Sequence, residues 1–429
     1  QNRGQGAAQK LKGMLLVTLF ATAGTAPLVA RAFHQFSIVS FAANLIIPPL
    51  VCFLLLPLAF VSSLIVILFN LTALPLSSLI QALAQVVLWV TEFLASLPLA
   101  NVHVQGPSMF AVFLYYAGLI VVLKINGLWR FIPVAVAGIV YIVTPFVVGS
   151  QTSVTFLDVG QGDSAVVRLP DGRVLLVDGG VRQGDSGQSA VVSYLWDSGI
   201  RKIDFMALSH GHPDHFGGLL DVMDRFKVQE IWYNGRFAHE SEPFFTKASG
   251  KGIKLRVLKR GSLIEGQEYQ AMALHPYDTF YSDGDVNVQE NNESLVFVLK
   301  LYDTAIMFTG DIEAEAEWDL GHLGKWLQCD IIKAPHHGGK TSSTPDLLQH
   351  ARPKVAIISV AANNQFGHPH KETLLRYSQA QVYRTDIDGA VTVHFDKSGF
   401  KVRTCSDYSL KEAHNMRDEL RNLRLFFYQ

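Results

Sequence analysis

Apolar residues fill long runs over the first 150 positions of the chain, and polar residues interrupt them only at intervals. Residues 13–30 are uncharged, and residues 32–91 contain no Asp, Glu, Lys or Arg. Two further apolar runs cover residues 109–123 and 131–148. Because about 20 apolar residues suffice for a helix to cross a bilayer, this pattern predicts a helical membrane domain with several spans.

The second of these runs contains residues that interrupt a regular helix. Asn44, Pro48, Pro49 and Pro57 all fall within residues 36–70. Proline removes a backbone donor and clashes with the preceding turn, and a membrane tolerates such breaks where the freed backbone faces a helix bundle or a cavity. We expect this stretch to form one long broken helix or a tight helical hairpin. The breaks suit the wall of a pore and a simple kink equally well.

Residues 77–97 show a different pattern of polar positions. Gln81, Gln85, Glu92 and Ser96 recur on or near one face, while apolar residues fill the other. This pattern is typical of an amphipathic helix that lies in the membrane interface. A membrane span that faces a polar cavity is the alternative.

The short connector between the last two apolar runs carries Lys124 and Arg130, together with Trp129. Basic residues in short loops favour the cytoplasmic side, and tryptophan is enriched at membrane interfaces. With this connector in the cytoplasm, the chain leaves the membrane on its outer side after residue 148. We therefore expect a multi-pass membrane protein whose remaining residues lie on the outer face.

After residue 150 the pattern changes to short apolar runs separated by Gly, Pro and Asp, which is typical of strands joined by tight turns. Helices are expected at 189–198 and from 217 onwards. The expected strands begin at 154 and continue at 165–169, 174–177, 203–208, 230–233, 254–258, 269–274, 294–302, 305–309, 331–332, 355–360, 381–383 and 390–395. Strands mixed with helices in this way fit a layered α/β sandwich, so the predicted fold class is a membrane α-helical domain followed by α/β.

The distribution of charge divides the chain at the same point. Of 36 basic and 37 acidic residues, only six and one lie in the first 150, so the later part is net acidic. A domain that handles a polyanion is usually more basic, so nucleic-acid binding would need local patches or divalent metals. The three cysteines, Cys52, Cys329 and Cys405, lack the spacing of a cysteine zinc site or a disulfide framework.

Residues 210–215 contain three histidines and an aspartate directly after the apolar run 203–208. Alternate residues of an extended loop point the same way, so His210 and His212 can hold one cation while Asp214 and His215 face a second. Without a metal, a polar turn of this kind would bury unpaired imidazoles and a carboxylate at a cost in stability. The motif therefore predicts a metal site at the end of a strand.

Three later strand ends carry further candidate ligands. Asp311 follows the strand 305–309 and can bridge two cations, His336 and His337 follow 331–332, and His368 lies after the strand 355–360. Binding residues commonly lie on loops at one edge of such a sheet. We therefore expect these side chains to meet the first motif at one rim.

Together with the apolar first part, these motifs resemble the ComEC-type competence proteins, inner-membrane channels for DNA uptake in naturally transformable bacteria. The spacing His-x-His-x-Asp-His resembles the signature of the metallo-β-lactamase fold. In the first part the resemblance rests on residues 36–40, 43–45 and 47–48, and residues 77–97 match the interfacial helix of that family. The matching motifs of the second part are residues 156–163, 209–218, 309–311, 335–338 and 366–369.

The resemblance implies three regions: a transmembrane competence-type helical domain at 1–149, a metallo-β-lactamase-like αββα sandwich at 150–405, and a helical C-terminal tail at 406–429. It places the protein in the inner membrane, with the sandwich on the periplasmic face. The chain begins with Gln1 rather than Met, and the OB-like domain and first spans of that family have no counterpart in it. We therefore expect the chain to be part of a longer protein.

The resemblance also implies a function and a ligand set. Single-stranded DNA would pass through the membrane domain, and the metal domain would hydrolyse the other strand. Two divalent metal ions, Zn²⁺ or Mn²⁺, are expected, with a single ion as the alternative; they would lower the pKa of a water and stabilise charge on a phosphodiester. The expected metal ligands are His210, His212, Asp214, His215, Asp311, His336 and His368. The expected catalytic residues are Asp214, Asp311 and His336.

Other residues are expected around this set. Asp163 and Asp178 would orient the histidines from outside the ligand set. The roles of His275 and His337 are left open, either next to the ligands in the same way or elsewhere. The basic side chains available for phosphate, or else simply solvated, are Lys333, Lys340 and Arg182.

The third ligand of the first metal is where the match to the fold is weakest. Many relatives use a histidine between the first motif and the bridging aspartate, and only His239 and His275 lie in that interval. His275 follows a strand and is the better placed, with a structural role as the alternative. Asn292 and Ser294, just before the next strand, are also candidates to face the site. We do not expect a fully equipped first metal position.

The expected partners are DNA, membrane lipid and other competence proteins, and an oligomer is compatible with the pattern. One alternative is a membrane-tethered metallo-hydrolase of small esters or phosphodiesters, because a fold does not determine a function. Another is a DNA channel whose soluble domain binds but does not cleave.

Overall fold

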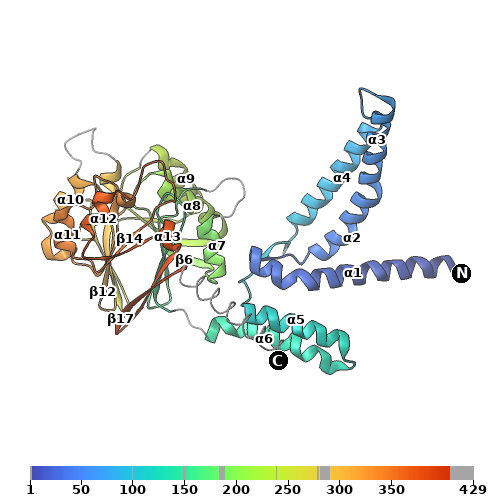
Figure 1. Cartoon of the computed structure of the whole chain (residues 1–429), viewed down its shortest axis with the longest axis horizontal. Helices are drawn as coiled ribbons and strands as arrows, with labels where there is room; N and C mark the ends of the chain where they lie inside the picture. Colours follow the sequence, from blue (N-terminus) through green and yellow to red (C-terminus); the bar gives the residue numbers. More distant parts are fainter. Residues whose placement is uncertain are drawn as a thin grey trace, which may run out of the picture. The chain divides into compact units, whose positions relative to one another are not determined.

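A computed structural model describes residues 2–98, 100–147, 151–182, 189–237, 239–277, 280 and 290–405 (Figure 1). The chain divides into two compact units, which are described separately: Gln1–Val148 with Trp196–Gly199, and Gly149–Leu195 with Ile200–Gln429. The expected C-terminal tail at 406–429 lies outside the described residues.

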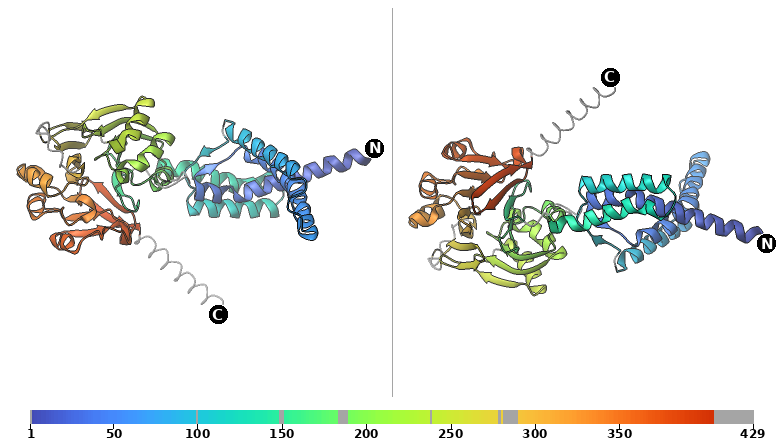
Figure 2. Two further views of the ribbon diagram at one scale, coloured as in Figure 1. Left: turned by 90° about the horizontal axis from the view of Figure 1, so that it is seen from above. Right: turned by 90° about the horizontal axis from the view of Figure 1, so that it is seen from below.

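The first unit is helical. In the described residues, the stretches 15–33, 40–69 and 77–96 are long and apolar enough to cross a membrane, and two shorter apolar helices follow. Helices α3 and α4 run back along one another, and α5 and α6 lie side by side (Figures 1 and 2). The helices are α1 (Asn2–Phe33), α2 (Ser40–Leu50), α3 (Leu56–Phe69), α4 (Ser77–Ser96), α5 (Met109–Lys124) and α6 (Ile132–Val147).

The proline-containing stretch forms one long interrupted helix rather than a hairpin. Pro48 and Pro49 lie in the last turn of α2, and a π-helical turn, Val51–Leu55, then joins α2 to α3. A π turn is a common response to a residue that cannot continue the regular hydrogen-bond ladder. The helix ends at Asn70, whose left-handed φ of 48° is a frequent helix terminus.

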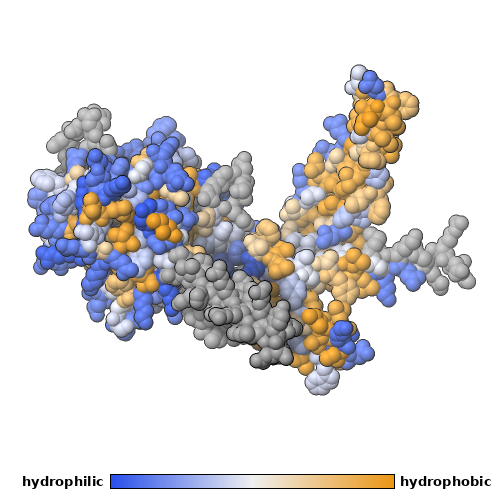
Figure 3. All heavy atoms as spheres, in the orientation of Figure 1, coloured by the Kyte–Doolittle hydropathy of each residue, from blue (hydrophilic) through white to orange (hydrophobic). Residues whose placement is uncertain are grey.

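Large apolar side chains cover the outside of the helices α2 to α4 (Figure 3). Phe53 is 76% exposed, Phe60 71% and Ile67 75%. An apolar surface of this extent suits lipid rather than water, because apolar side chains in contact with lipid avoid the free-energy cost of exposure to water. The first unit therefore has the composition and surface of a membrane domain.

The second unit is an α/β sandwich of two sheets, as expected from the sequence. The central strands of both sheets bury both faces, as strands covered by helices do. The eight-stranded sheet has the order β17-β16-β3-β4-β5-β6-β7-β8 and the seven-stranded sheet the order β15-β14-β13-β12-β11-β10-β9. The strands of the first sheet are β3 (Ser153–Phe156), β4 (Ala165–Arg168), β5 (Val174–Val177), β6 (Lys202–Ala207), β7 (Lys227–Tyr233), β8 (Lys254–Val257), β16 (Val391–Asp396) and β17 (Gly399–Thr404). Those of the second are β9 (Leu263–Gly266), β10 (Tyr269–His275), β11 (Val296–Leu301), β12 (Thr304–Phe308), β13 (Ile331–Lys333), β14 (Val355–Ile358) and β15 (Gln381–Arg384).

The main core lies between the two sheets. Phe308 of β12 stacks on Phe156 of β3 at a ring-centroid distance of 6.0 Å and on Phe297 of β11 at 4.9 Å. These three rings are almost completely buried. Aromatic contacts across the sheets contribute beyond their buried area, so they hold the strand ends in a constant relative position.

Helices cover the outer faces of both sheets (Figure 1). A second apolar cluster joins Ala316 and Leu320 of α10 (Ala314–Gly321) and Leu347 of α11 (Pro345–Ala351) to the seven-stranded sheet. On the other sheet lie α7 (Ala190–Asp197), α8 (Pro213–Arg225) and α9 (Glu242–Gly250). Strands β5 to β8 pair in parallel, and so do β12 to β15, so the carboxyl ends of each set meet at one edge.

Candidate metal centre

The His-x-His-x-Asp-His motif forms the tight connection between β6 and α8. His212 is the residue before the helix, and Pro213 begins it, which suits the fixed φ of proline. A side chain at Gly218 would collide with the backbone of Gly179, so glycine permits the helix to approach the loop after β5. This close approach places the motif at the rim of the sheet.

His210 and His212 lie side by side at the start of the motif, and of the two only His210 belongs to a group of clustered ligand atoms among the described residues. Nε2 of His210 lies 3.0 Å from Nδ1 of His212. Two nitrogens bound to one tetrahedral zinc ion are roughly 3.3 Å apart, so this spacing suits a shared cation. Burial, with His215 nearby, holds the pKa of His210 well below its ordinary value, so its imidazole is neutral and able to bind a metal.

The second group of ligand atoms gathers around one carboxylate oxygen. Oδ2 of Asp311 lies 3.3 Å from Nε2 of His215 and 3.2 Å from Nε2 of His337. Nε2 of His337 is also 3.5 Å from Oδ2 of Asp214. Both ring nitrogens are buried and lack a hydrogen-bond partner among the described residues. Such atoms are costly unless a cation binds them, so the residues present fit a divalent metal.

The contacts at the turn after β13 change one expected assignment. His337, expected to lie outside the ligand set, points its ring into the cluster, whereas His336 lies 3.6 Å from Glu313 through its Nδ1. Both residues have left-handed φ values, 47° and 53°, so the turn directs the two rings to different sides. Among the described residues, His337 rather than His336 therefore belongs to the groups of atoms that could hold a metal ion.

Two further histidines also lie outside the clustered ligand atoms. His368 is adjacent, with its ring centroid 6.4 Å from that of His337, but belongs to none of the groups of ligand atoms. His275 is buried elsewhere, with Nε2 2.8 Å from the carbonyl oxygen of Asn292. Among the described residues, His275 belongs to no group of clustered ligand atoms, so a structural role for it stays a prediction.

Each clustered histidine has its other ring nitrogen held by a neighbour. Nδ1 of His215 lies 3.0 Å from Oδ2 of Asp178, and Nδ1 of His337 lies 2.9 Å from the carbonyl oxygen of Ser359. Nε2 of His212 lies 3.2 Å from Oε2 of Glu290. Partners of this kind fix the ring orientation and raise the basicity of a metal ligand.

The hydroxyl groups next to His210 complete this pattern. Nδ1 of His210 lies 3.0 Å from Oγ of Ser209 and 3.3 Å from Oγ of Ser294. The backbone N–H of Asp311 donates to the same Ser294 hydroxyl at 3.0 Å. Ser294, a candidate to face the first metal position, therefore contacts Nδ1 of His210, whereas Nε2 of the same ring faces His212.

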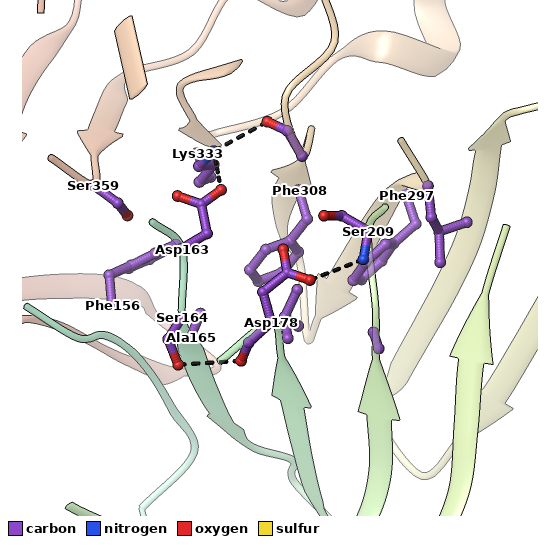
Figure 4. Close-up of a pocket in the computed structure, with 14 residues that line it drawn as sticks. Phe156, Asp163, Ser164, Ala165, Asp178, Ser209, Phe297, Phe308, Lys333 and Ser359 are labelled. Atoms are coloured by element: carbon purple, nitrogen blue, oxygen red, sulfur yellow. Dashed lines mark hydrogen bonds and ion pairs between the residues drawn. The ribbon is translucent and has the colours of Figure 1, made fainter. Parts of the chain in front are cut away.

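A buried lysine, Lys333, lies beside Asp163 (Figure 4). Nζ of Lys333 forms an ion pair with Asp163, lies 3.3 Å from Oδ1 of Asp311 and donates to the carbonyl oxygen of Gly310 at 3.0 Å. Its side chain is fully enclosed, so it is not available at the surface for phosphate, as had been considered from the sequence. The adjoining cavity of about 20 Å³ has room for one water.

The other two basic candidates remain at the surface. Nε of Arg182 lies 3.4 Å from Oδ1 of Asp221, and its side chain is 57% exposed. Lys340 is exposed on the turn that follows His337. Only Lys340 is therefore both exposed and on the same turn as a clustered ligand.

Opposite charges hold the pKa values of the clustered groups far from their ordinary range. Burial lowers the pKa of His215, but the carboxylates of Asp311 and Asp178 outweigh burial and raise it well above 6.5. Asp311 and Asp163 raise the pKa of His337 in the same way. Burial raises the pKa of Asp311, but His337 and His215 lower it well below its ordinary value. The buried carboxylates are therefore stabilised by protonated histidines or other cations beside them. A divalent ion would replace the protons on these histidines.

Comparisons with known proteins agree with both units. Residues 1–129 match the family model described as "Competence protein", and residues 157–362 match that of the "Metallo-beta-lactamase superfamily". The chain is 27% identical to "ComE operon protein 3" of Bacillus subtilis (strain 168), over 89% of this chain and 52% of that protein. It is 27% identical to "Competence protein ComA" of Neisseria gonorrhoeae, over 95% of this chain and 53% of that protein. The chain therefore spans about half the length of these curated relatives.

Among solved structures, the metallo-β-lactamase fold protein YhfI from Bacillus subtilis is 13% identical with a TM-score of 0.38, over 59% of this chain and all of YhfI. The fold and the family model define the second unit as a metallo-β-lactamase domain, a class that binds divalent metals and suggests a metal-dependent hydrolase. Residues 1–129 match a competence-protein model as well, so the resemblance to ComEC-type proteins is confirmed.

Proposed function

We propose that this chain is the channel and nuclease portion of an inner-membrane DNA-uptake protein. One strand would pass through the helical unit, and the α/β unit would hydrolyse the other strand with divalent metal ions. The single observation that carries the proposal is the clustering of Asp214, His215 and His337, two of which also contact Asp311, in a chain that also matches a competence-protein model.

The residues of the cluster have distinct roles in this proposal. Asp214, His215 and His337 would hold one ion, His210 and His212 would hold the other, and Asp311 would contribute a carboxylate to the site. Ions bound there would activate a water and stabilise the charge that develops on a phosphodiester. Burial raises the pKa of Asp311, but His337, His215 and the enclosed Lys333 lower it, so Lys333 helps to keep this carboxylate ionised.

The test uses the full chain purified in detergent, with end-labelled single-stranded and duplex DNA in Mn²⁺, Zn²⁺ or Mg²⁺. We expect metal-dependent cleavage that Asp214→Ala abolishes. Asp346→Ala, which changes an exposed carboxylate on α11, should cleave like the wild type. Metal-loaded protein that cuts neither substrate would contradict the nuclease role.

A second candidate is a channel whose α/β domain binds DNA without cleaving it. The observation that favours it is that the clustered ligand atoms of the described residues include no histidine between His215 and Asp311. A domain of this kind would bind labelled DNA with the same affinity in the presence of a chelator as in the presence of a divalent metal ion. A membrane-tethered hydrolase of small esters would instead show metal-dependent ester hydrolysis without DNA cleavage.

The same proposal extends to the boundaries and the placement of the protein. We propose a helical domain at 1–149 and a metallo-β-lactamase-like domain at 150–405, with the second on the periplasmic face. Lys124 and Arg130 support this orientation, because they flank the connector between the last two apolar helices. Accessibility of a cysteine introduced at the exposed Ser398, in a variant that lacks Cys52, Cys329 and Cys405, distinguishes the two faces in intact cells.

A further inference from the structure

The loop after β14 carries an exposed aromatic ring beside the metal-binding cluster. Phe366 is 54% exposed, and its ring stacks on that of His368 with centroids 5.8 Å apart and planes inclined by 29°. The His368 ring lies 5.4 Å from that of His336 and 6.4 Å from that of His337. Because Nε2 of His337 faces Asp311, these rings form a continuous series from the centre to the surface.

Hydrogen bonds within the loop hold Phe366 in place. The amide nitrogen of Asn364 donates to the carbonyl oxygens of Ala361 at 3.0 Å and His368 at 2.7 Å. The side-chain oxygen of Asn364, Oδ1, accepts hydrogen bonds from the backbone N–H groups of Phe366 at 3.2 Å and His368 at 3.0 Å. A ring held in this way loses little conformational entropy when a ligand binds it.

The loop also packs directly on the turn that contains a metal ligand. The backbone N–H of His370 donates to the carbonyl oxygen of Gly338 at 3.0 Å. A Cβ at Gly338, where φ is 79°, would lie 2.7 Å from Cβ of Pro369. The distance from Phe366 to the cluster is therefore set by backbone contacts rather than by a free loop.

We propose that Phe366 and His368 form a stacking platform for an unpaired nucleobase next to the phosphodiester that the cluster cleaves. This inference rests on the nuclease function proposed above and specifies its substrate as single-stranded DNA. The face of an aromatic ring stacks on any base, and each such contact is worth about 1–3 kcal/mol by alanine substitution. In a duplex the base faces are covered, and turning a base out costs a few kcal/mol. The platform therefore favours a single strand over a duplex.

The charges around the platform agree with a nucleotide. Lys340 is exposed on the turn that follows His337, and no acidic side chain lies within the loop from Ala361 to His370. His370 lies beside His368, with ring centroids 5.3 Å apart. A phosphate next to a stacked base would therefore meet no carboxylate from this loop, although the domain as a whole is acidic.

The experiment uses the full chain in detergent with Mn²⁺ and a labelled single-stranded oligonucleotide of defined cleavage sites. A matched series of oligonucleotides carries a single abasic position, which lies one nucleotide further along the strand in each member until it has passed a cleaved bond. We expect an abasic position next to that bond to lower kcat/KM about tenfold for the wild type, mainly through KM. Phe366→Ala should show the same loss on the intact strand and no further loss on the abasic one, and Phe366→Trp should retain activity. Trp318→Ala, which removes an exposed ring on α10, is the matched control.

Binding measured without cleavage separates this inference from the nuclease proposal. In an Asp214→Ala background, 2-aminopurine placed in the strand should be quenched on binding, and Phe366→Ala should restore its fluorescence and weaken binding about tenfold. If the wild type does not cleave DNA but Phe366→Ala still changes base stacking, only the nuclease proposal fails. Equal kcat/KM and equal quenching for Phe366→Ala and the wild type would overturn the platform.

Discussion

Nε2 of His337 lies 3.2 Å from Oδ2 of Asp311, whereas the neighbouring His336 turns its ring toward Glu313. The two adjacent histidines therefore provide an internal comparison for the ligand assignment. We expect His337→Ala to lose one bound metal ion and to reduce DNA cleavage by at least about a hundredfold, because it removes a ligand outright.

His336→Ala is the matched control for that variant. It should keep the same number of bound ions, since the His336 ring nitrogen belongs to none of the clustered ligand groups. Metal content measured on the dialysed protein checks both variants together with the cleavage rate. Loss of a metal ion from His336→Ala with retention in His337→Ala would reverse the assignment.

Glu290 tests the support of the first metal position. Its Oε2 lies 3.2 Å from Nε2 of His212, which leaves Nδ1 of His212 facing His210. We expect Glu290→Gln to weaken binding of the first ion by about 10- to 100-fold and to leave the second ion unchanged. Calorimetric titration of Mn²⁺ resolves the two steps. Glu265→Gln, on β9 and paired with Gln270, is the control, and equal titrations for both variants would exclude this role of Glu290.

The sequence was sufficient to predict the fold and most of the cluster, because the informative signals are local. The motif from His210 to His215 follows one strand, and Asp311 follows another, so each prediction needed only a strand and the turn after it. Parallel pairing then brings those strand ends to one edge. The uncharged runs at the start predicted the apolar helices for the same reason, since length and composition decide them.

The remaining details depend on contacts that a sequence does not display. His336 and His337 are neighbours of one type, and only the backbone angles of the turn decide which ring enters the cluster. The burial of Lys333 depends on Asp163, which a different sheet supplies. The sequence contained one indication that Lys333 is buried. It directly follows Ile331-Ile332 on a buried strand, where a lysine exposed to water is not expected.

Lys333 is expected to stabilise the domain through its two carboxylate partners. Lys333→Met removes the buried lysine cation that pairs with both Asp163 and Asp311, which costs about 3–5 kcal/mol in the free energy of unfolding. Added Mn²⁺ should recover part of this loss, because a divalent ion also neutralises Asp311. Urea unfolding with and without Mn²⁺ measures both effects. Lys354→Met, which removes an exposed lysine paired with Asp330, should change the free energy by less than about 1 kcal/mol.

His275 makes the stability of the domain depend on pH. Burial lowers its pKa to about 4, and Nε2 lies 2.8 Å from the carbonyl oxygen of Asn292. The unfolded chain binds a proton at His275 below pH ~6.5, whereas the folded chain does not until about pH 4, so the free energy of unfolding falls as the pH falls across this window. The loss from this group is roughly 3 kcal/mol. The wild type should therefore lose stability between these pH values in chelator.

His275→Gln is the variant that tests this origin, because glutamine can donate to the same carbonyl oxygen but does not titrate. We expect its urea midpoint to depend less on pH between about 6.5 and 4 than that of the wild type. Its metal content should equal that of the wild type, since His275 lies outside the clustered ligand groups. A lost metal ion would instead make His275 the missing third ligand of the first position. An unchanged pH dependence would show that the clustered histidines, rather than His275, dominate acid unfolding.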